Sequence, residues 1–513
     1  MSKTIVELCR DHGLPSGESG SASLSRDVLA ARVYDLVEAG APLVLLYATD
    51  ERAAARGFVV HAAVQAADGL LTLESALPAE DPRYPSITRL VMAAHWFERL
   101  MHDQFGVIAE GHPDFRRLMH HENMPAGTHP LRKDFAWNTK LPVADEPSPM
   151  HRVEGKGVYE IPVGPIHAGI IEPGHFRFNV RGERILSLEG KLFFTHKGVE
   201  KLVEGKMPEE AMRFVERVSG DMVVGHTLAY AQAVERVTGT IPSARAKALR
   251  VLWNELERLT AHLFDMGNMP GNGTGFSFMA AQGFRMVEEL RRMHAMLVGH
   301  RFLRGAIVLG GAHDVSTESQ EQILATLAET ERDLKEVLNI AFTNDGLMDR
   351  FETTGVLSEA AARAYGARGP AARASRVATD LRAELPYAAY ATHAPEIVTE
   401  KAGDVAARFR VRARECAESL RLIRAVLEEL PEGAPAVPLE GGTGSAYGWN
   451  EAWRGAVVDW VALDAKGRIE RLVITDPSFM NWPLFGEIGP GNIVPDFPLC
   501  NKSLSLSYSG TDL

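Results

Sequence analysis

The chain has 513 residues, of which 45% are hydrophobic and 24% charged, which is typical of a soluble globular protein. At roughly 100–200 residues per domain, this length allows about two to four domains and a large core. The formal net charge of −12 argues against a phosphate-binding surface, so we expect no nucleic-acid partner.

The cysteine content indicates a reducing compartment. Cys9, Cys416 and Cys500 are scattered and odd in number, so no disulfide framework is expected. Iron–sulfur clusters usually need four thiolates, and no metal site of this chain's own is predicted. Residues 1–4 lead into no apolar core of the kind a signal peptide needs. No run of about 18 apolar residues occurs, so no transmembrane segment is expected.

Residues 1–135 are predicted to form an α/β domain. The apolar pattern in it predicts three strands and a helix, at 42–47, 57–64, 70–77 and 93–105. The stretch 136–156 that follows is rich in proline and acidic residues and has no clean period, so we interpret it as a linker.

Residues 157–513 are predicted to form a mainly helical bundle with peripheral strands, which makes the fold class α+β. Strands are expected at 157–163, 176–180, 184–188, 457–463 and 469–475. Apolar stripes at helical spacing predict helices at 246–264, 286–297 and 405–427, the last with Asp404 as N-cap. The glycine-rich stretch 271–275 lies between two helices, so we interpret it as a flexible connection and not as a dinucleotide loop.

Four polar segments are candidates for chemistry. The first, 164–175, carries two imidazoles and a carboxylate, His167, His175 and Glu172. Such a segment can transfer protons, because histidine and a partly buried glutamate both titrate near neutral pH. A plain polar turn bounded by proline and glycine explains it equally well. The other three segments are 216–222 with His226, 451–455, and 476–478.

These segments belong to a longer resemblance. The N-terminal part resembles the C subunit of respiratory complex I through Tyr84-Pro85-Ser86, Trp96-Phe97-Glu98-Arg99, Asp103-Gln104-Phe105-Gly106, Glu110-Gly111-His112-Pro113, Arg116-Arg117 and His129-Pro130-Leu131-Arg132-Lys133-Asp134. The remainder resembles the complex I D subunit and the large subunit of membrane-bound energy-converting nickel–iron hydrogenases, including the formate hydrogenlyase type. It does so through Glu255-Leu256-Glu257-Arg258, Ala261-His262-Leu263, Gly355-Val356-Leu357, Gly369-Pro370, Arg373-Ala374-Ser375, Asp380-Leu381-Arg382 and Pro386-Tyr387. The resemblance runs from about residue 40 onward, and the fused order is common in this family.

The hydrogenases of this family hold nickel with two Cys-x-x-Cys pairs. The first pair matches Ser219 and Met222, and the second matches Ser478 and Asn481. Hydroxyl, thioether and amide groups are poor substitutes for thiolate on a soft metal, so the resemblance implies a site without nickel. Hydrogenases also lose a C-terminal tail after nickel insertion. Without nickel, we expect the tail through Asp512 and Leu513 to stay and pack.

The resemblance also implies roles for individual residues. Complex I binds a quinone headgroup in the vacated cavity, with a tyrosine whose position here is Gly220. His175 is a candidate for the quinone histidine, and Glu172 matches a glutamate assigned to proton transfer in the hydrogenases. A carboxylate at Asp221, near His226 and Arg454, would make a titratable pocket. Asp221 as an ordinary surface residue explains the sequence equally well.

The function implied is that of a subunit in a membrane-bound multi-subunit oxidoreductase. The expected catalytic residues are Glu172, His175 and His226, and the expected pocket residues are His167, Asp221, Arg454, Ser219 and Ser478. The chain itself is expected to bind no cofactor, with iron–sulfur clusters in partner subunits and quinone as one candidate acceptor. Antiporter-like membrane subunits would hold it on the cytoplasmic face of the cell membrane. The alternative is an inactive scaffold that transmits conformational change.

Overall fold

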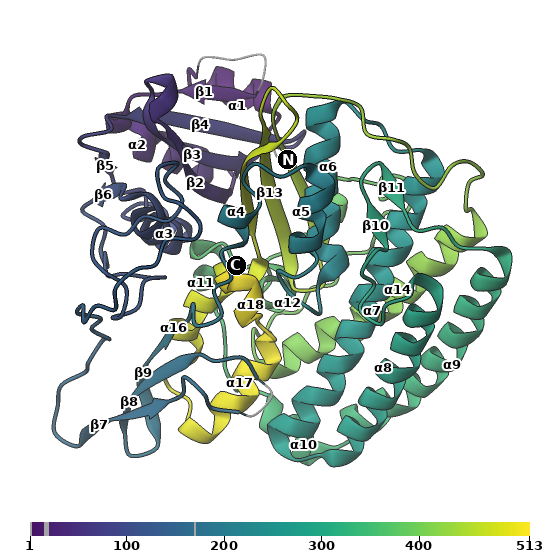
Figure 1. Cartoon of the computed structure of the whole chain (residues 1–513). Coiled ribbons are helices and arrows are strands. Elements are labelled where there is room, and N and C mark those ends of the chain that lie inside the picture. Colours follow the sequence, from purple (N-terminus) through teal and green to yellow (C-terminus); the bar gives the residue numbers. More distant parts are fainter. Residues whose placement is uncertain (1–2, 15–19, 169–170) are drawn as a thin grey trace.

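The structure is a computed structural model that describes residues 3–14, 20–168 and 171–513. Figure 1 shows an N-terminal sheet unit on one side, long helices on the other, and a central sheet between them. The predicted α+β class is confirmed. Residues 1–2 of the N-terminal stretch and residues 169–170 of the 164–175 segment lie outside the described residues.

The N-terminal unit is a four-stranded sheet in the order β1-β4-β3-β2, with β1 parallel to β4 and the other pairs antiparallel. The three strands expected here are confirmed as β2, β3 and β4, and the expected helix as α3. α2 packs against β4, and α3 packs against β2. The bounds are α1 Ile5–Asp11, β1 Ser21–Ser23, α2 Arg26–Glu38, β2 Leu43–Glu51, β3 Gly57–Gln65, β4 Leu70–Leu77, β5 Arg83–Pro85, α3 His95–Phe105 and β6 Ile108–Glu110.

Residues 111–157 contain no helix or strand. They lead into an antiparallel sheet of β7 (Val158–Val163), β8 (His175–Arg181) and β9 (Arg184–Lys191), as the pattern predicts. His175 is therefore the first residue of a strand, and the loop between β7 and β8 ends just before it.

The bundle is built on α7 (Ala244–Thr274), α8 (Ser277–Val298), α9 (Thr317–Phe342) and α14 (Val405–Glu428). The Asp404 carboxylate accepts a hydrogen bond from the Ala407 amide at 2.8 Å, which confirms the predicted N-cap of α14. Both α8 and α14 pack along α7.

The prediction of a flexible connection at 271–275 is wrong, because α7 continues through Thr274 and only Gly275, with φ +85°, leaves the helix. The glycines of this region serve close packing instead. A Cβ on Gly283 of α8 would lie 2.6 Å from the Gly267 Cα of α7, and one on Gly271 would lie 2.4 Å from the Ala280 Cβ. Only glycine lets the two helices approach this closely.

The central antiparallel sheet consists of β12 (Gly444–Ala452), β13 (Gly455–Leu463) and β14 (Ile469–Thr475). α6 (Val223–Thr238) covers one face. The other face meets the N-terminal sheet, where the rings of Trp460 and Tyr47 lie 5.1 Å apart between centroids. The central sheet thus joins the N-terminal unit to the helical part.

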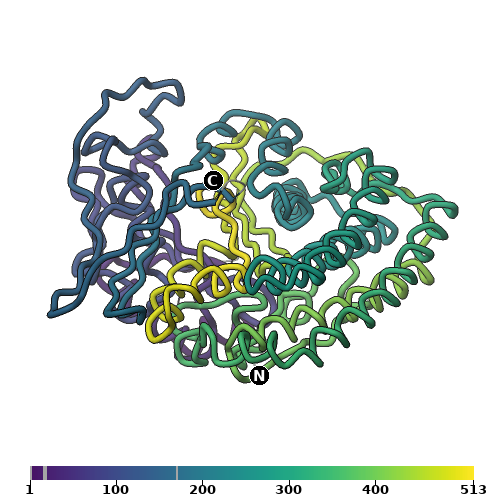
Figure 2. Tube along the Cα trace, turned by 90° about the horizontal axis from the view of Figure 1, so that it is seen from below, coloured from purple at the N-terminus to yellow at the C-terminus, as the bar shows by residue number. Residues whose placement is uncertain are grey.

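The C-terminal segment folds back between the N-terminal unit and the bundle, as the yellow trace in Figure 2 shows. It comprises α15 (Pro477–Asn481), α16 (Phe485–Ile488), α17 (Phe497–Leu504) and α18 (Tyr508–Asp512). The buried Asp512 carboxylate accepts hydrogen bonds from the Phe193 and Thr195 amides, at 2.8 and 2.9 Å. The expected packing of the tail is confirmed.

Shorter elements complete the chain: η1 Arg52–Ala54, η2 Met92–Ala94, α4 Val199–Leu202, α5 Pro208–Val215, β10 Ile307–Val308, β11 Gly311–Ala312, α10 Asp345–Phe351, α11 Glu359–Ala364, α12 Gly369–Arg373, α13 Leu381–Glu384, η3 Trp482–Leu484 and η4 Val494–Asp496. Among the residues that the structure describes, no helix is both long and apolar enough to span a bilayer.

Candidate functional site

A pair of serine hydroxyls marks the centre of the candidate site. Ser219 precedes the N-terminus of α6, and Ser507 is the N-cap of α18. Their Oγ atoms lie 2.9 Å apart. The Ser507 amide also donates to Ser478 Oγ at 2.9 Å, so Ser478 helps to hold the Ser507 backbone in place. The site is therefore a junction of α6, α15 and α18.

An ion pair flanks the serines. Arg454, at the turn between β12 and β13, donates two hydrogen bonds of 2.7 Å to the Asp221 carboxylate. The Arg454 guanidinium is buried, stacks on the Trp453 ring and donates to the Ser505 carbonyl. The Asp221 side chain is 44% exposed and accepts a third hydrogen bond from Ser219 Oγ at 3.0 Å. Asp221 thus lies at the rim of the site, with its carboxylate turned inward.

A carboxylate–imidazole pair lies behind the serines. His226 Nε2 of α6 is 3.0 Å from Asp476 Oδ2, and both side chains are fully buried. Burial by itself raises the pKa of Asp476. The hydrogen bonds from His226 and Ser478 and the charges of His226 and Arg454 outweigh burial and hold this pKa below its usual value. The ionised carboxylate can only accept, so Nε2 is assigned as the donor. No described residue hydrogen-bonds to His226 Nδ1.

The predicted residues of the 164–175 segment lie on the outer side of α18. His167 Nε2 is 3.1 Å from the Tyr508 hydroxyl, and the exposed Glu172 accepts from the Ser509 amide at 2.8 Å. His175 Nδ1 is 3.3 Å from the Gly164 carbonyl. Hence His167 and Glu172 contact α18 at Tyr508 and Ser509, whereas Ser219 contacts its N-cap Ser507.

Of the positions matched to nickel ligands, Ser219 and Ser478 both hydrogen-bond to Ser507, whereas the other two make separate contacts. Asn481 hydrogen-bonds to the backbone of Arg368 through both its amide atoms, at 2.9 and 3.1 Å. Met222 packs in a small apolar cluster with Ala452 and Trp453. The residue that faces Ser219 is Ser507, which sequence reasoning missed. No local signal marks Ser507, because the contact joins residues 288 positions apart.

Glu257 is a second residue that sequence reasoning missed. It lies on α7, and its carboxylate accepts from the Val224 and Gly225 amides at the start of α6, at 2.7 and 2.9 Å. Burial raises its pKa to about 8, although these two amide donors oppose the shift. A group with this pKa exchanges its proton near neutral pH, within one helical turn of His226.

A separate network of buried charged residues surrounds Arg373. Arg373 of α12 contacts Glu415 of α14 and Glu451 of β12, each at 2.7 Å. Burial and the neighbouring Asp380 raise the pKa of Glu451 to about 7, with Arg373 opposing the shift. Further members of the network are Glu255, Arg258, His262 and Arg382. The core beside the candidate site is thus ionic and titratable.

Comparisons with known proteins agree with this architecture. Residues 29–140 match the family model of the respiratory-chain NADH dehydrogenase 30 Kd subunit, and residues 273–441 match that of the 49 Kd subunit. Formate hydrogenlyase subunit 5 of Escherichia coli (strain K12) is 32% identical over 486 residues, which cover 92% of this chain and 85% of that protein. Hydrogenase-4 component G of the same strain is 33% identical, with 92% and 83% covered.

A more distant relative is the C/D 2 subunit of the NADH-quinone oxidoreductase of Aquifex aeolicus (strain VF5), 29% identical over 70% of this chain and 66% of that one. Among solved structures, a chain of the membrane-bound sulfane sulfur reductase, an archaeal respiratory membrane complex, matches with a TM-score of 0.66 and 26% identity, over 70% of this chain and 99% of that one. The chain therefore belongs to the family of fused complex I 30-kDa and 49-kDa subunits that includes formate hydrogenlyase subunit 5 and hydrogenase-4 component G.

Proposed function

We propose that this chain is the large redox subunit of a membrane-bound respiratory complex related to complex I and formate hydrogenlyase, and that its site works without nickel. The relatives support the type of complex, because one is a formate hydrogenlyase subunit and another an NADH-quinone oxidoreductase subunit. Partner subunits would carry iron–sulfur clusters, and antiporter-like membrane subunits would hold the chain at the cytoplasmic face of the membrane.

The donor chemistry supports a nickel-free site. Ser219 and Ser507 offer hydroxyls, and the thioether of Met222 is enclosed by apolar neighbours. None of these replaces thiolate on a soft metal. The cysteines Cys416 and Cys500 are buried on α14 and α17, where desolvation raises the pKa of both thiols. Within the described ranges, no three His, Cys, Asp or Glu side chains gather as a metal-ligand group.

The reaction supported best is the two-electron, two-proton reduction of a carbonyl acceptor such as a quinone to its quinol. Electrons would come one at a time from the partner clusters, and protons from titratable side chains. The Ser219–Ser507 hydroxyl pair, flanked by Asp221–Arg454 and by His226–Asp476, carries this proposal, because it places hydrogen-bond donors and a proton reservoir together. Glu172 and His175 would pass protons inward from the surface.

A scaffold role is the second candidate, and one observation favours it. α18 is largely buried, with its N-cap Ser507 bonded to Ser219 and with His167 and Glu172 bonded to the next two residues of the helix. A subunit whose site stays covered would transmit conformational change between partners without binding an acceptor. Movement of α18 thus decides between the two functions.

The test is purification of the complex from native membranes, followed by partner identification, metal analysis and quinone-analogue reduction. Iron–sulfur and antiporter-like subunits should copurify, without stoichiometric nickel. Glu172→Gln and Arg454→Gln should lower the rate of reduction several-fold. Glu183→Gln, at an exposed hairpin turn, is the matched control and should leave the rate unchanged. Full rates in both site variants would favour the scaffold, and stoichiometric nickel would overturn the nickel-free site.

A further inference from the structure

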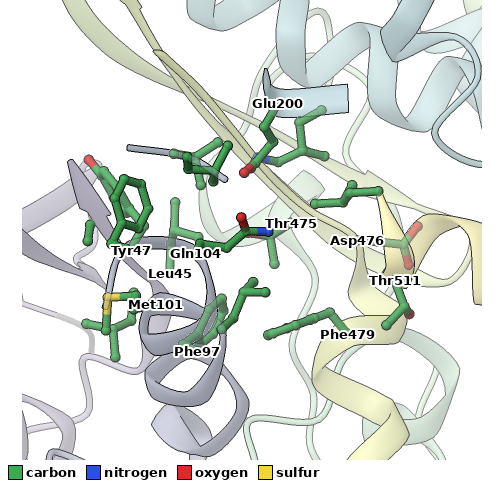
Figure 3. Close-up of a pocket in the computed structure, with 18 of the residues that line it drawn as sticks. Leu45, Tyr47, Phe97, Met101, Gln104, Glu200, Thr475, Asp476, Phe479 and Thr511 are labelled. Carbon is green, nitrogen blue, oxygen red and sulfur yellow. The ribbon is translucent and has the colours of Figure 1, made fainter. Parts of the chain in front are cut away.

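A cavity of about 40 Å³ lies between the N-terminal unit and the central sheet, outside the serine pair (Figure 3). β2 and α3 form one wall, and β14, α15 and α18 form the other. Most of its lining is apolar and includes Leu45, Phe97, Met101, Phe105, Val473 and Phe479.

Three polar side chains in this lining each have an atom to which no described residue hydrogen-bonds. They are Gln104 Oε1, Arg471 Nε and Thr475 Oγ1, and these residues are only 6%, 5% and 2% exposed. Arg471 Nη1 forms an ion pair with the Glu200 carboxylate at 3.1 Å. Glu200 also lines the cavity. Figure 3 shows the Gln104 amide reaching from α3 toward Thr475 of β14.

Buried polar groups of this kind are almost always hydrogen-bonded in native proteins, commonly to an internal water. A cavity of about 40 Å³ holds roughly three water molecules. A drug-sized ligand needs several times this volume. An apolar occupant would leave the amide, the guanidinium nitrogen and the hydroxyl unpaired. Water is the occupant that satisfies all three groups.

The cavity ends at the candidate site. Asp476, the partner of His226, lines it together with Gly510 and Thr511 of α18. In Figure 3, Asp476 and Thr511 stand at the end of the cavity away from Tyr47. The buried carboxylate–imidazole pair therefore has a cavity beside it that reaches toward the N-terminal unit and contains a few polar groups.

We propose that this cavity holds an ordered water cluster, anchored on Gln104, Arg471 and Thr475, through which the Asp476–His226 pair exchanges protons with the junction of the two halves of the chain. When the pair takes up a proton, a water gives it, and that water regains a proton from its neighbour and finally from solvent. The role of this proton in turnover rests on the proposed function. The water cluster and the proton exchange through it are independent of the proposed function.

Two measurements on the purified complex test the inference. A high-resolution map should show ordered water within hydrogen-bonding distance of Gln104, Arg471 and Thr475. Deuterium exchange at the His226 imidazole C2 position, followed by mass spectrometry, should slow several-fold in a Gln104→Leu, Thr475→Val double variant, because apolar replacements remove two of the three anchors. Thr330→Val on α9 is the matched control, since Thr330 is equally buried but bonds only within its own helix.

A dry or collapsed cavity in the map would overturn the inference, as would His226 exchange that is the same in the double variant and the wild type. A bound organic molecule in place of water would also overturn it. The map of the wild-type complex is decisive even if the double variant fails to fold. Neither measurement involves electron transfer, so loss or retention of quinone reduction bears on the proposed function alone.

Discussion

The hydroxyl oxygens of Ser219 and Ser507, 288 positions apart in the chain, lie 2.9 Å from each other. Ser507 Oγ also accepts from the Gly510 amide at 2.9 Å, so the same hydroxyl caps α18 and closes the site. The hydrogen bond joins the segment just before α6, which packs on the central sheet, to α18 at the C-terminus. Movement of α18 away from α6 would break this hydrogen bond.

Ser507→Ala should destabilise the protein, because it removes both an N-cap hydroxyl and the hydrogen bond that joins Ser219 to the start of α18. Loss of an N-cap serine costs about 1 kcal/mol, which should lower Tm by about 1 °C in a chain of this length. Calorimetry of the purified chain measures this. Ser445→Ala, at an exposed position of β12, should leave Tm unchanged, and an equal Tm in the two variants would contradict the capping role.

The Asp221–Arg454 pair should respond asymmetrically to substitution. Arg454→Met removes a buried guanidinium that also holds the Ser505 carbonyl, and should cost about 2–3 kcal/mol. Asp221→Asn should cost less than about 1 kcal/mol, because the Asp221 side chain is half in water. The charges of Asp265 and Asp476 still stabilise Arg454 in that variant. Urea unfolding curves compare the two, and equal losses would show that Asp221 is as important as its partner.

The sequence predicts the fold well where the local pattern is clear. β3 and β4 are largely apolar runs separated by a short turn, α14 carries an apolar stripe at helical spacing, and all three form as expected. The glycines at 271–275 led to a wrong prediction, because glycine occurs both in flexible loops and where two helices cross closely. Only the position of α8 against α7 distinguishes these two cases. The Ser219–Ser507 contact is long-range, so no local pattern contains it. Glu257 lies beside an apolar stripe, and its unusual pKa arises from the burial that the fold imposes on it against the start of α6.

Glu257 should make stability fall as pH rises. Its pKa is about 8 in the folded protein and about 4.5 when unfolded, so the unfolded chain gives up this proton first. The free energy of unfolding should therefore decline between about pH 4.5 and 8, and stay low above that range. Glu257→Gln cannot ionise and should flatten the decline of Tm measured from pH 6 to 8. Glu321→Gln, exposed on α9, should keep the slope of the wild type, and an unchanged slope in Glu257→Gln would contradict the shifted pKa.

Arg373 should be the most sensitive member of the buried network. Arg373→Met leaves Glu415 and Glu451 without the guanidinium that both contact at 2.7 Å, and breaking a buried pair in this way costs about 3–5 kcal/mol. The midpoint of urea unfolding should fall accordingly. Arg363→Met, which breaks an exposed pair with Glu359, should cost well under about 1 kcal/mol.

Adding Glu451→Gln to Arg373→Met should recover part of the loss, because it removes one of the two buried carboxyls that lose their cation. The recovery should be larger at pH 8 than at pH 6. Glu451 has a pKa of about 7 beside Arg373, and without that cation it should hold its proton to still higher pH. The unfolded chain loses this proton near pH 4.5, so the cost of keeping the folded carboxyl neutral grows with pH, and an amide removes more of that cost at pH 8 than at pH 6. Recovery that is the same at both pH values would mean that the network loses packing on Arg373→Met, and not charge compensation.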